Sequence, residues 1–208
     1  MREYTIIGIT GQTGAGKSSI TQYAQSIGCH IIDADLTARK ILEKGSVCLD
    51  CLSVAFGNDI VHSDGTLDRK LLAKRAFSSD ENTDKLNSIT HPFIFAETIR
   101  TIDSIRNIEK AAVIILDAPT LLESRIDVIC DYVIAVICPE SIRRERIIKR
   151  DGLSEADADI RLKAQKDDSF YIGKSDFILN GADNPDKLHM KLKDIILETA
   201  GHREVNKC

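Results

Sequence analysis

The stretch GQTGAGKSS at residues 11–19 constrains this chain more than any other segment. It matches the pattern GxxxxGK[ST] and directly follows the apolar run YTIIGIT at residues 4–10, which is typical of a buried strand. Small residues allow backbone N–H groups to turn toward phosphate oxygens, and a helix that begins at the loop adds its positive end. The segment therefore predicts a phosphate-binding loop between a strand and a helix.

The chemistry of this loop indicates a nucleotide bound with Mg²⁺. Lys17 can reach the β- and γ-phosphates, and the Ser18 hydroxyl can ligate Mg²⁺. A second metal ligand is expected where an apolar strand ends in an acid, and Asp117 closes AAVIILD at 111–117, although a strand-end cap is the alternative. The glycine order GxxGxG disfavours a dinucleotide site, which needs GxGxxG. The predicted nucleotide-binding residues here are Gly11, Gln12, Thr13, Gly14, Ala15, Gly16, Lys17, Ser18 and Ser19.

Short apolar runs alternate with longer amphipathic stretches along the chain. Near-continuous apolar runs are typical of strands in a parallel sheet that helices cover on both faces. The alternation predicts an α/β class, a three-layer P-loop NTPase core with a five-stranded, mostly parallel sheet. The expected strands are residues 4–10, 29–33, 111–117, 132–138 and 176–179.

Two long helical blocks interrupt this alternation. No strand-like run occurs between residues 34 and 108, and residues 139–168 form a highly charged block with five arginines. We interpret residues 1–208 as a single domain built around the phosphate loop. The core is expected at 1–33, 109–138 and 172–200, a helical insertion at 34–108, and an arginine-rich helical segment at 139–171.

Charge and hydropathy argue against two kinds of partner, nucleic acids and membranes. A net charge of −4 argues against bulk nucleic-acid binding, which needs excess positive charge. No run approaches the roughly 20 apolar residues of a membrane helix, and the start of the sequence lacks a secretion signal. We therefore expect a cytoplasmic protein, a monomer or weak homo-oligomer, without membrane or nucleic-acid partners.

Cys48 and Cys51 form a CxxC, but no second pair accompanies it, so a helix face is favoured over a metal or redox site.

A phosphate loop serves either nucleotide hydrolysis or phosphoryl transfer to an acceptor. A GTPase would show DxxG after the metal-binding strand and NKxD later, and neither is present. A kinase instead needs an acceptor-binding insertion and a lid that excludes water. Both features are expected here, so residues 1–208 are interpreted as a single P-loop kinase domain, with the helical acceptor-binding insertion at 34–108 and the arginine-rich lid at 139–171. A kinase for another nucleotide or nucleoside acceptor and a non-catalytic nucleotide-binding regulator are the alternatives.

Several motifs together resemble those of dephospho-CoA kinases. The resemblance extends from about residue 6 to residue 190 and implies transfer of the γ-phosphoryl of ATP, with Mg²⁺, to the ribose 3′-hydroxyl of dephospho-CoA. The products would be CoA and ADP, in the last step of CoA biosynthesis. The matching motifs are GITGQTGAGKSS (8–19), IIDADLTAR (31–39), LDRKLLAKRAF (67–77), LNSITHPFI (86–94), DAPTLLE (117–123), RIIKRDGLS (146–154) and LKAQ (162–165).

On the acceptor side, the resemblance implies that Asp35 is the general base, that Arg39 helps to hold the acceptor, and that Asp33 lies near metal and acceptor. His91 and Pro92 would belong to the acceptor-binding helices. The residues give Asp35 independent support, since a carboxylate just past the carboxyl end of a strand can accept a hydroxyl proton, although it could also cap a helix. Because a residue before proline disfavours the α conformation, we expect His91 to lie outside a helix.

On the lid side, the resemblance implies that Arg146 and Arg150 neutralise the transferring phosphoryl group and that Asn180 lies near the adenine. Arg146 and Arg150 are four residues apart and share a helix face, and guanidinium groups suit phosphate. We expect Arg143 and Arg144 to face solvent or to pair with Glu140 and Glu145.

The chain departs from the family pattern at positions that do not carry the expected catalytic charges. These departures place lid details and adenine packing in question, rather than activity. They are Gln12-Thr13 for Gly-Ile, Thr120 for an aliphatic residue, Arg143 for a lid glutamine, and Ser175 for alanine.

Overall fold

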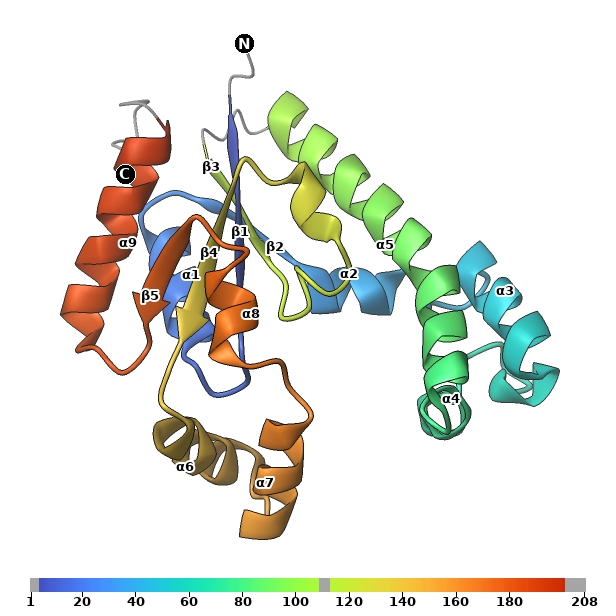
Figure 1. The fold of residues 1–208 in the computed structure, drawn as a ribbon. Helices are drawn as coiled ribbons and strands as arrows, with labels where there is room; N and C mark the ends of the chain where they lie inside the picture. Colours follow the sequence, from blue (N-terminus) through green and yellow to red (C-terminus); the bar gives the residue numbers. More distant parts are fainter. Residues whose placement is uncertain (1–3, 109–112, 201–208) are drawn as a thin grey trace. The chain divides into compact units, whose positions relative to one another are not determined.

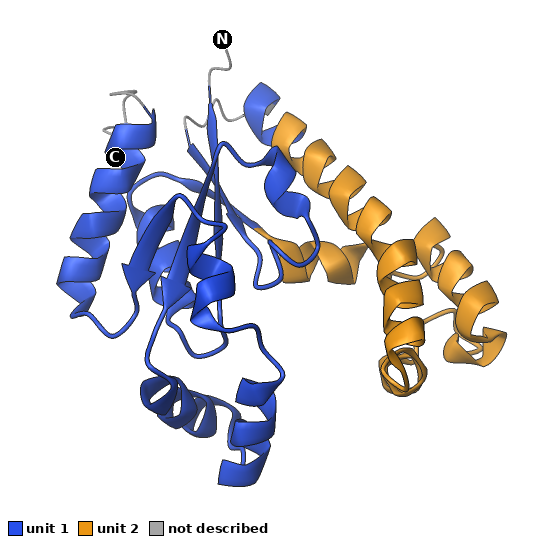
Figure 2. Ribbon diagram, viewed as in Figure 1, with its two compact units in different colours: residues 1–32, 104–208 blue, residues 33–103 orange. Residues whose placement is uncertain are grey.

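A computed structural model describes residues 4–108 and 113–200 of the chain. The chain divides into two compact units: unit 1, residues 1–32 and 104–208, and unit 2, residues 33–103 (Figure 2). Unit 2 contains most of the residues expected to form the acceptor-binding insertion. Residues 109–112 of the expected core, which include the start of the third expected strand, lie outside the described residues.

Five strands form one sheet in the order β2-β3-β1-β4-β5 (Figure 1). The three pairs with a described register, β1–β3, β1–β4 and β4–β5, are parallel. The central position of β1 brings the carboxyl ends of β3 and β4 to either side of the loop that follows β1. The strands are β1 (Thr5–Gly11), β2 (His30–Asp33), β3 (Val113–Asp117), β4 (Tyr132–Ile137) and β5 (Phe177–Asn180).

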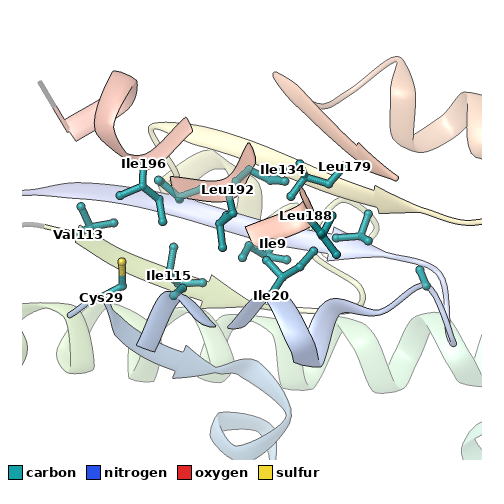
Figure 3. Packing of buried hydrophobic residues seen from close by; sticks show 14 of the residues in the cluster. Ile9, Ile20, Cys29, Val113, Ile115, Ile134, Leu179, Leu188, Leu192 and Ile196 are labelled. Atoms are coloured by element: carbon teal, nitrogen blue, oxygen red, sulfur yellow. The ribbon is translucent and has the colours of Figure 1, made fainter. Parts of the chain in front are cut away.

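Helices pack against this sheet and explain why its strands are continuously apolar. Ile9 and Ile134 lie in a core cluster with Ile20 of the helix that follows the phosphate loop (Figure 3). Leu188, Leu192, Ile196 and Ala200 recur every four residues in the C-terminal helix and bury one of its faces in the same cluster. The helical elements of unit 1 are α1 (Lys17–Ser26), η2 (Ile126–Ile129), α6 (Glu140–Asp151), α7 (Glu155–Lys163), α8 (Asp168–Ile172), α9 (Pro185–Ala200) and the end of α5 (Asp80–Ile108).

Unit 2 is helical and has its own core. Buried side chains from α3 and α4, among them Leu52, Phe56 and Leu72, pack with partly buried residues of α5. Arg75 crosses this unit and donates two hydrogen bonds of 2.6 Å to the carboxylate of Asp59. The elements of unit 2 are α2 (Ala34–Lys40), α3 (Val47–Phe56), η1 (Asn58–Ile60), α4 (Arg69–Ala76) and most of α5.

The expectation that His91 lies outside a helix is wrong. α5 continues through Pro92 from Asp80 to Ile108. Proline removes one N–H donor from the helix interior. Packing outweighs this local cost, because Ile89 and Phe93 on either side of the proline pack against the core of unit 2.

The CxxC lies on a helix, as predicted. Both cysteines belong to α3, where Cys48 is buried and Cys51 is exposed. Within residues 4–108 and 113–200, no group of three or more His, Cys, Asp or Glu side chains is arranged to hold a metal ion. The same ranges contain no helix with the length and apolar character that crossing a membrane requires.

Candidate functional site

The predicted phosphate loop connects β1 to α1. Gly11 ends β1 opposite Val136 of β4, and α1 begins at Lys17. Gly14 and Gly16 have φ angles of +76° and +106°, which are left-handed conformations that favour glycine. The loop therefore folds back on itself at the carboxyl edge of the sheet, where ligands bind in open α/β folds.

Lys17 lies over the loop that precedes it. Its ammonium group donates hydrogen bonds to the Gly11 carbonyl oxygen at 2.5 Å and to the Gln12 carbonyl oxygen at 3.2 Å. Ser18 and Ser19 are exposed at the start of α1. The Ser19 hydroxyl lies 3.2 Å from Nε2 of His189, whose ring stacks on Tyr23 at a centroid distance of 4.2 Å. His189 was not predicted as part of this region, because it comes from α9, 170 residues away in sequence.

The expected metal ligands lie on segments that border the loop. Asp117 is the last residue of β3 and is in register with Ile9 of β1, two residues before Gly11. The Ala118 N–H donates to the Ile9 carbonyl at 3.1 Å, which holds the end of β3 against β1. A carboxylate and a hydroxyl are hard oxygen ligands of the kind that Mg²⁺ prefers, so Asp117 and Ser18 fit that ion.

Both predicted lid arginines lie beside the phosphate loop. Arg146 donates to the carbonyl oxygens of Gly14 at 3.2 Å and Ala15 at 3.4 Å, and to the Gly181 carbonyl at 2.9 Å. Its guanidinium group thus connects the phosphate loop with the turn after β5. Arg150 donates to the Asp151 carboxylate and, at 3.4 Å, to the Thr13 hydroxyl. The Arg150 guanidinium lowers the pKa of Asp151 below its ordinary value.

Two expectations about the neighbouring arginines are wrong. Arg143 is only 5 % exposed, and its Nε donates to the Cys138 carbonyl at 2.9 Å. Arg144 pairs with Asp159 at 2.6 Å and with Glu155 at 3.0 Å, both on α7. The reason is that α7 folds back against α6, and spacing within one helix does not reveal partners from the next.

The turn after β5 packs directly on the phosphate loop. A Cβ atom added to Gly181 would lie 1.7 Å from the Ala15 carbonyl oxygen, so only glycine fits there. The Asn180 carboxamide oxygen accepts a hydrogen bond from the Ala182 N–H at 3.0 Å and thereby shapes this turn. The structure thus places Gly181, the residue after Asn180, against the phosphate loop. The Ser175 hydroxyl, at one departure from the family pattern, is buried with no partner among the described residues.

The predicted acceptor residues all belong to unit 2. Asp33 caps α2, because its carboxylate accepts hydrogen bonds from the N–H groups of Asp35 at 2.8 Å and Leu36 at 3.0 Å. The cap is therefore Asp33 rather than Asp35. Asp35 and Arg39 are exposed and four residues apart, which places them on one face of α2.

The other two acceptor residues lie in the middle of α5. His91 is partly buried and Pro92 is exposed. Burial lowers the pKa of His91 below its ordinary value. Glu97, one to two turns further along, forms an ion pair of 2.6 Å with Lys40 and so ties α5 to α2.

Gln165 is a further residue of the loop region whose contact was not predicted. Its carboxamide oxygen accepts a hydrogen bond of 2.9 Å from the Thr13 N–H. The motif LKAQ contains this glutamine, but the resemblance assigns it no role. The contact spans 152 residues of sequence, so nothing in the local pattern indicates it.

Comparison with known proteins decides the family. The family model described as dephospho-CoA kinase matches residues 5–186. The chain belongs to the dephospho-CoA kinase family.

Relatives of this family member cover nearly its whole length. It is 38% identical over 190 residues to a dephospho-CoA kinase of Corynebacterium diphtheriae, covering 91% of this chain and 94% of that one. It is 33% identical over 190 residues to a dephospho-CoA kinase of Idiomarina loihiensis, covering 91% and 92%. The resemblance stated from the motifs is thus confirmed.

Solved structures agree with the predicted fold class. Dephospho-CoA kinase from Campylobacter jejuni superposes with a TM-score of 0.69 at 27% identity, covering 95% of this chain and 98% of that one. The structure of TT1252 from Thermus thermophilus superposes with a TM-score of 0.78 at 26% identity, with the same coverage. A shikimate kinase from Bacteroides thetaiotaomicron, at 13% identity and a TM-score of 0.53, shares the fold alone, with 92% of this chain covered and 98% of that one.

Proposed function

We propose that this protein transfers the γ-phosphoryl group of ATP to the ribose 3′-hydroxyl of dephospho-CoA, which yields CoA and ADP and completes CoA biosynthesis. The observation that carries the proposal is the family match over residues 5–186 in a chain whose phosphate loop is complete. Kinase activity needs no covalent intermediate on the protein, so positioning and charge neutralisation supply most of the catalysis.

The phosphate loop supplies the nucleotide site in this proposal. The backbone N–H groups at the start of α1 and the Lys17 ammonium would hold the β- and γ-phosphates. Ser18 and Asp117 would hold Mg²⁺, which when bound neutralises negative charge on the phosphate oxygens. Asn180 shapes the turn that packs on the loop, in keeping with a place near the adenine.

Asp35, in the first turn of α2, is a better candidate base than Asp33, which precedes the helix. The Asp33 carboxylate accepts hydrogen bonds from two N–H groups at the start of the helix, and this capping role holds it in place. Asp35 is exposed in the first turn and can accept the proton of the acceptor hydroxyl. Arg39, one turn later, would hold the acceptor by charge. His91 and Pro92 would contribute surface on α5.

The two lid arginines, Arg150 and Arg146, differ in how firmly their guanidinium groups are held. Arg150 makes only a 3.4 Å contact with the loop and otherwise pairs with exposed Asp151, so its guanidinium can turn to the transferring phosphoryl group. Arg146 is held by three carbonyl oxygens. We propose that it adds positive charge beside the phosphates while keeping the loop and the β5 turn together.

The test measures ADP release from ATP and Mg²⁺ with dephospho-CoA, adenosine, AMP or no acceptor. Stimulation by dephospho-CoA alone, with CoA identified as the product by mass spectrometry, is expected. Stimulation by another acceptor would move the assignment to that substrate. Tight ATP binding without acceptor-dependent ADP release would refute a kinase activity.

A further inference from the structure

Two hydrogen bonds tie the phosphate loop to the end of the lid. Gln165 accepts from the Thr13 N–H at 2.9 Å, and the Gln12 side chain donates from Nε2 to the Lys166 carbonyl at 3.0 Å. We call these four residues, Gln12, Thr13, Gln165 and Lys166, the loop strap. The strap joins consecutive residues of the loop to consecutive residues that follow α7, so the two segments can separate only if both bonds break.

Gln165 is itself held in place by Arg143. Arg143 Nη1 lies 3.5 Å from the same carboxamide oxygen that accepts from Thr13, and its Nε donates to the Cys138 carbonyl at the end of β4. Arg143 is 5 % exposed. A buried guanidinium that donates to the Cys138 carbonyl and lies 3.5 Å from the Gln165 oxygen restricts where that oxygen can lie, because few rotamers satisfy both contacts.

Gln12, the other side chain in the loop strap, is buried. The side chain is 2 % exposed, and its Oε1 has no hydrogen-bond partner within the part of the chain that the structure describes. Burial of half a carboxamide without a partner is unfavourable. The hydrogen bond from Nε2 to the Lys166 carbonyl partly offsets the cost of burying this side chain.

We propose that Gln165 is a positioning residue for nucleotide binding, which fixes the shape of residues 11–16 through Thr13 and is oriented by Arg143. The Gln165 carboxamide oxygen accepts a hydrogen bond from the Thr13 N–H, and this bond holds the loop in one conformation before a phosphate binds. Such preorganisation strengthens binding because less conformational entropy is lost in the complex. The Thr13 hydroxyl also accepts a hydrogen bond from Arg150, so Thr13 contacts both Gln165 and a lid arginine.

This inference rests on the proposed function only in that the loop binds a nucleotide. It does not require that dephospho-CoA be the acceptor. The decisive measurement is therefore the affinity for ADP with Mg²⁺, measured by titration calorimetry without any acceptor, so failure of the acceptor assignment and failure of this inference are distinguishable.

The principal variant is Gln165→Met, which keeps the length of the side chain and removes the acceptor oxygen. We expect ADP affinity to fall about fivefold, the equilibrium effect of one net hydrogen bond. We expect KM for ATP to rise by a similar factor, while kcat and KM for the acceptor stay within about twofold. Gln25→Met, the same change on the exposed face of α1, is the matched control and should leave all of these values unchanged.

A second variant protects the test against misfolding. Gln12→Met removes the other strap bond and should also weaken ADP binding. The Arg143→Gln change should weaken it less, and combined with Gln165→Met it should add nothing, because Arg143 acts through Gln165. Unchanged ADP affinity in both Met variants would overturn the inference. A lower ADP affinity together with a higher KM for the acceptor and a lower melting temperature would also overturn the inference, since that pattern indicates a general role in folding.

Discussion

Gly14 offers the sharpest structural prediction, because its replacement by alanine perturbs the phosphate loop in two separable ways. The residue has φ of +76°, a conformation that costs an L-residue about 1–2 kcal/mol. A Cβ atom there would also lie 2.8 Å from the carbonyl oxygen and 3.1 Å from the Cα atom of Arg143 on α6. These are backbone atoms, so α6 must move away to admit the methyl group.

The steric part can be isolated with a control at the other end of the same helix. Gly152 follows α6 with φ of +65°, and a Cβ atom added there meets nothing within 4 Å. Gly152→Ala should therefore cost only the conformational term, about 1–2 kcal/mol. Gly14→Ala should cost that amount plus about 1–3 kcal/mol of overpacking. Gly28→Ala, with φ of +93° and open space, provides a second control.

The assay is urea unfolding of the nucleotide-free protein, followed by circular dichroism. The free energy of unfolding should fall about 1–3 kcal/mol further for Gly14→Ala than for Gly152→Ala. Displacement of α6 also withdraws Arg146 from the Gly14 and Ala15 carbonyls, so the KM for ATP should rise in the first variant and not in the second. Equal losses for the two variants, within about 0.5 kcal/mol, would refute the close approach of α6 to the loop.

Three further predictions concern charge and protonation. Lys17→Ala should lower kcat about 10²–10³-fold, because it removes a fixed charge at the phosphates, and steady-state kinetics with saturating ATP checks this loss. Asp35→Asn should lower kcat at least about 10²-fold while calorimetric ATP affinity stays near wild type; near-normal turnover would remove Asp35 as the base. Burial lowers the folded-state pKa of His91, so the unfolded chain binds more protons below about pH 6.5 and stability should fall as the pH drops from there. His91→Gln should flatten this part of the curve in thermal unfolding between pH 5 and 7, and an unchanged slope would contradict the burial of that ring.

Local patterns predicted the framework of this protein well. Each described strand lies within two residues of its expected range, and α1 ends next to Gly28, whose φ of +93° suits the end of a helix. The phosphate loop was identifiable because its chemistry resides in one contiguous segment. Asp68 caps α4 by accepting a hydrogen bond from the Leu71 N–H, and aspartate is a residue that often precedes a helix.

Features set by contacts between distant segments were not predictable. The burial of Arg143 depends on how α6 meets Gly14 of the loop and Gln165 after α7, and neither residue belongs to α6. The helical conformation of His91 follows from apolar packing of α5 against α3 and α4, which overrides the preference imposed by Pro92. The contacts of Gln165 and His189 with the loop region have no local signature at all, since they join residues more than 150 positions apart.

The bonds that Lys17 makes have a consequence for how affinity should be understood. Its ammonium already donates to the carbonyl oxygens of Gly11 and Gln12 within its own loop. A phosphate group that replaces one of these carbonyls at the ammonium exchanges a neutral acceptor for a charged one. The net gain is therefore the difference between charged and neutral acceptors rather than the full strength of a new bond. Selectivity among ligands at Lys17 should therefore follow the charge of the bound phosphate. Weakly charged ligands gain too little to displace the carbonyls of the loop.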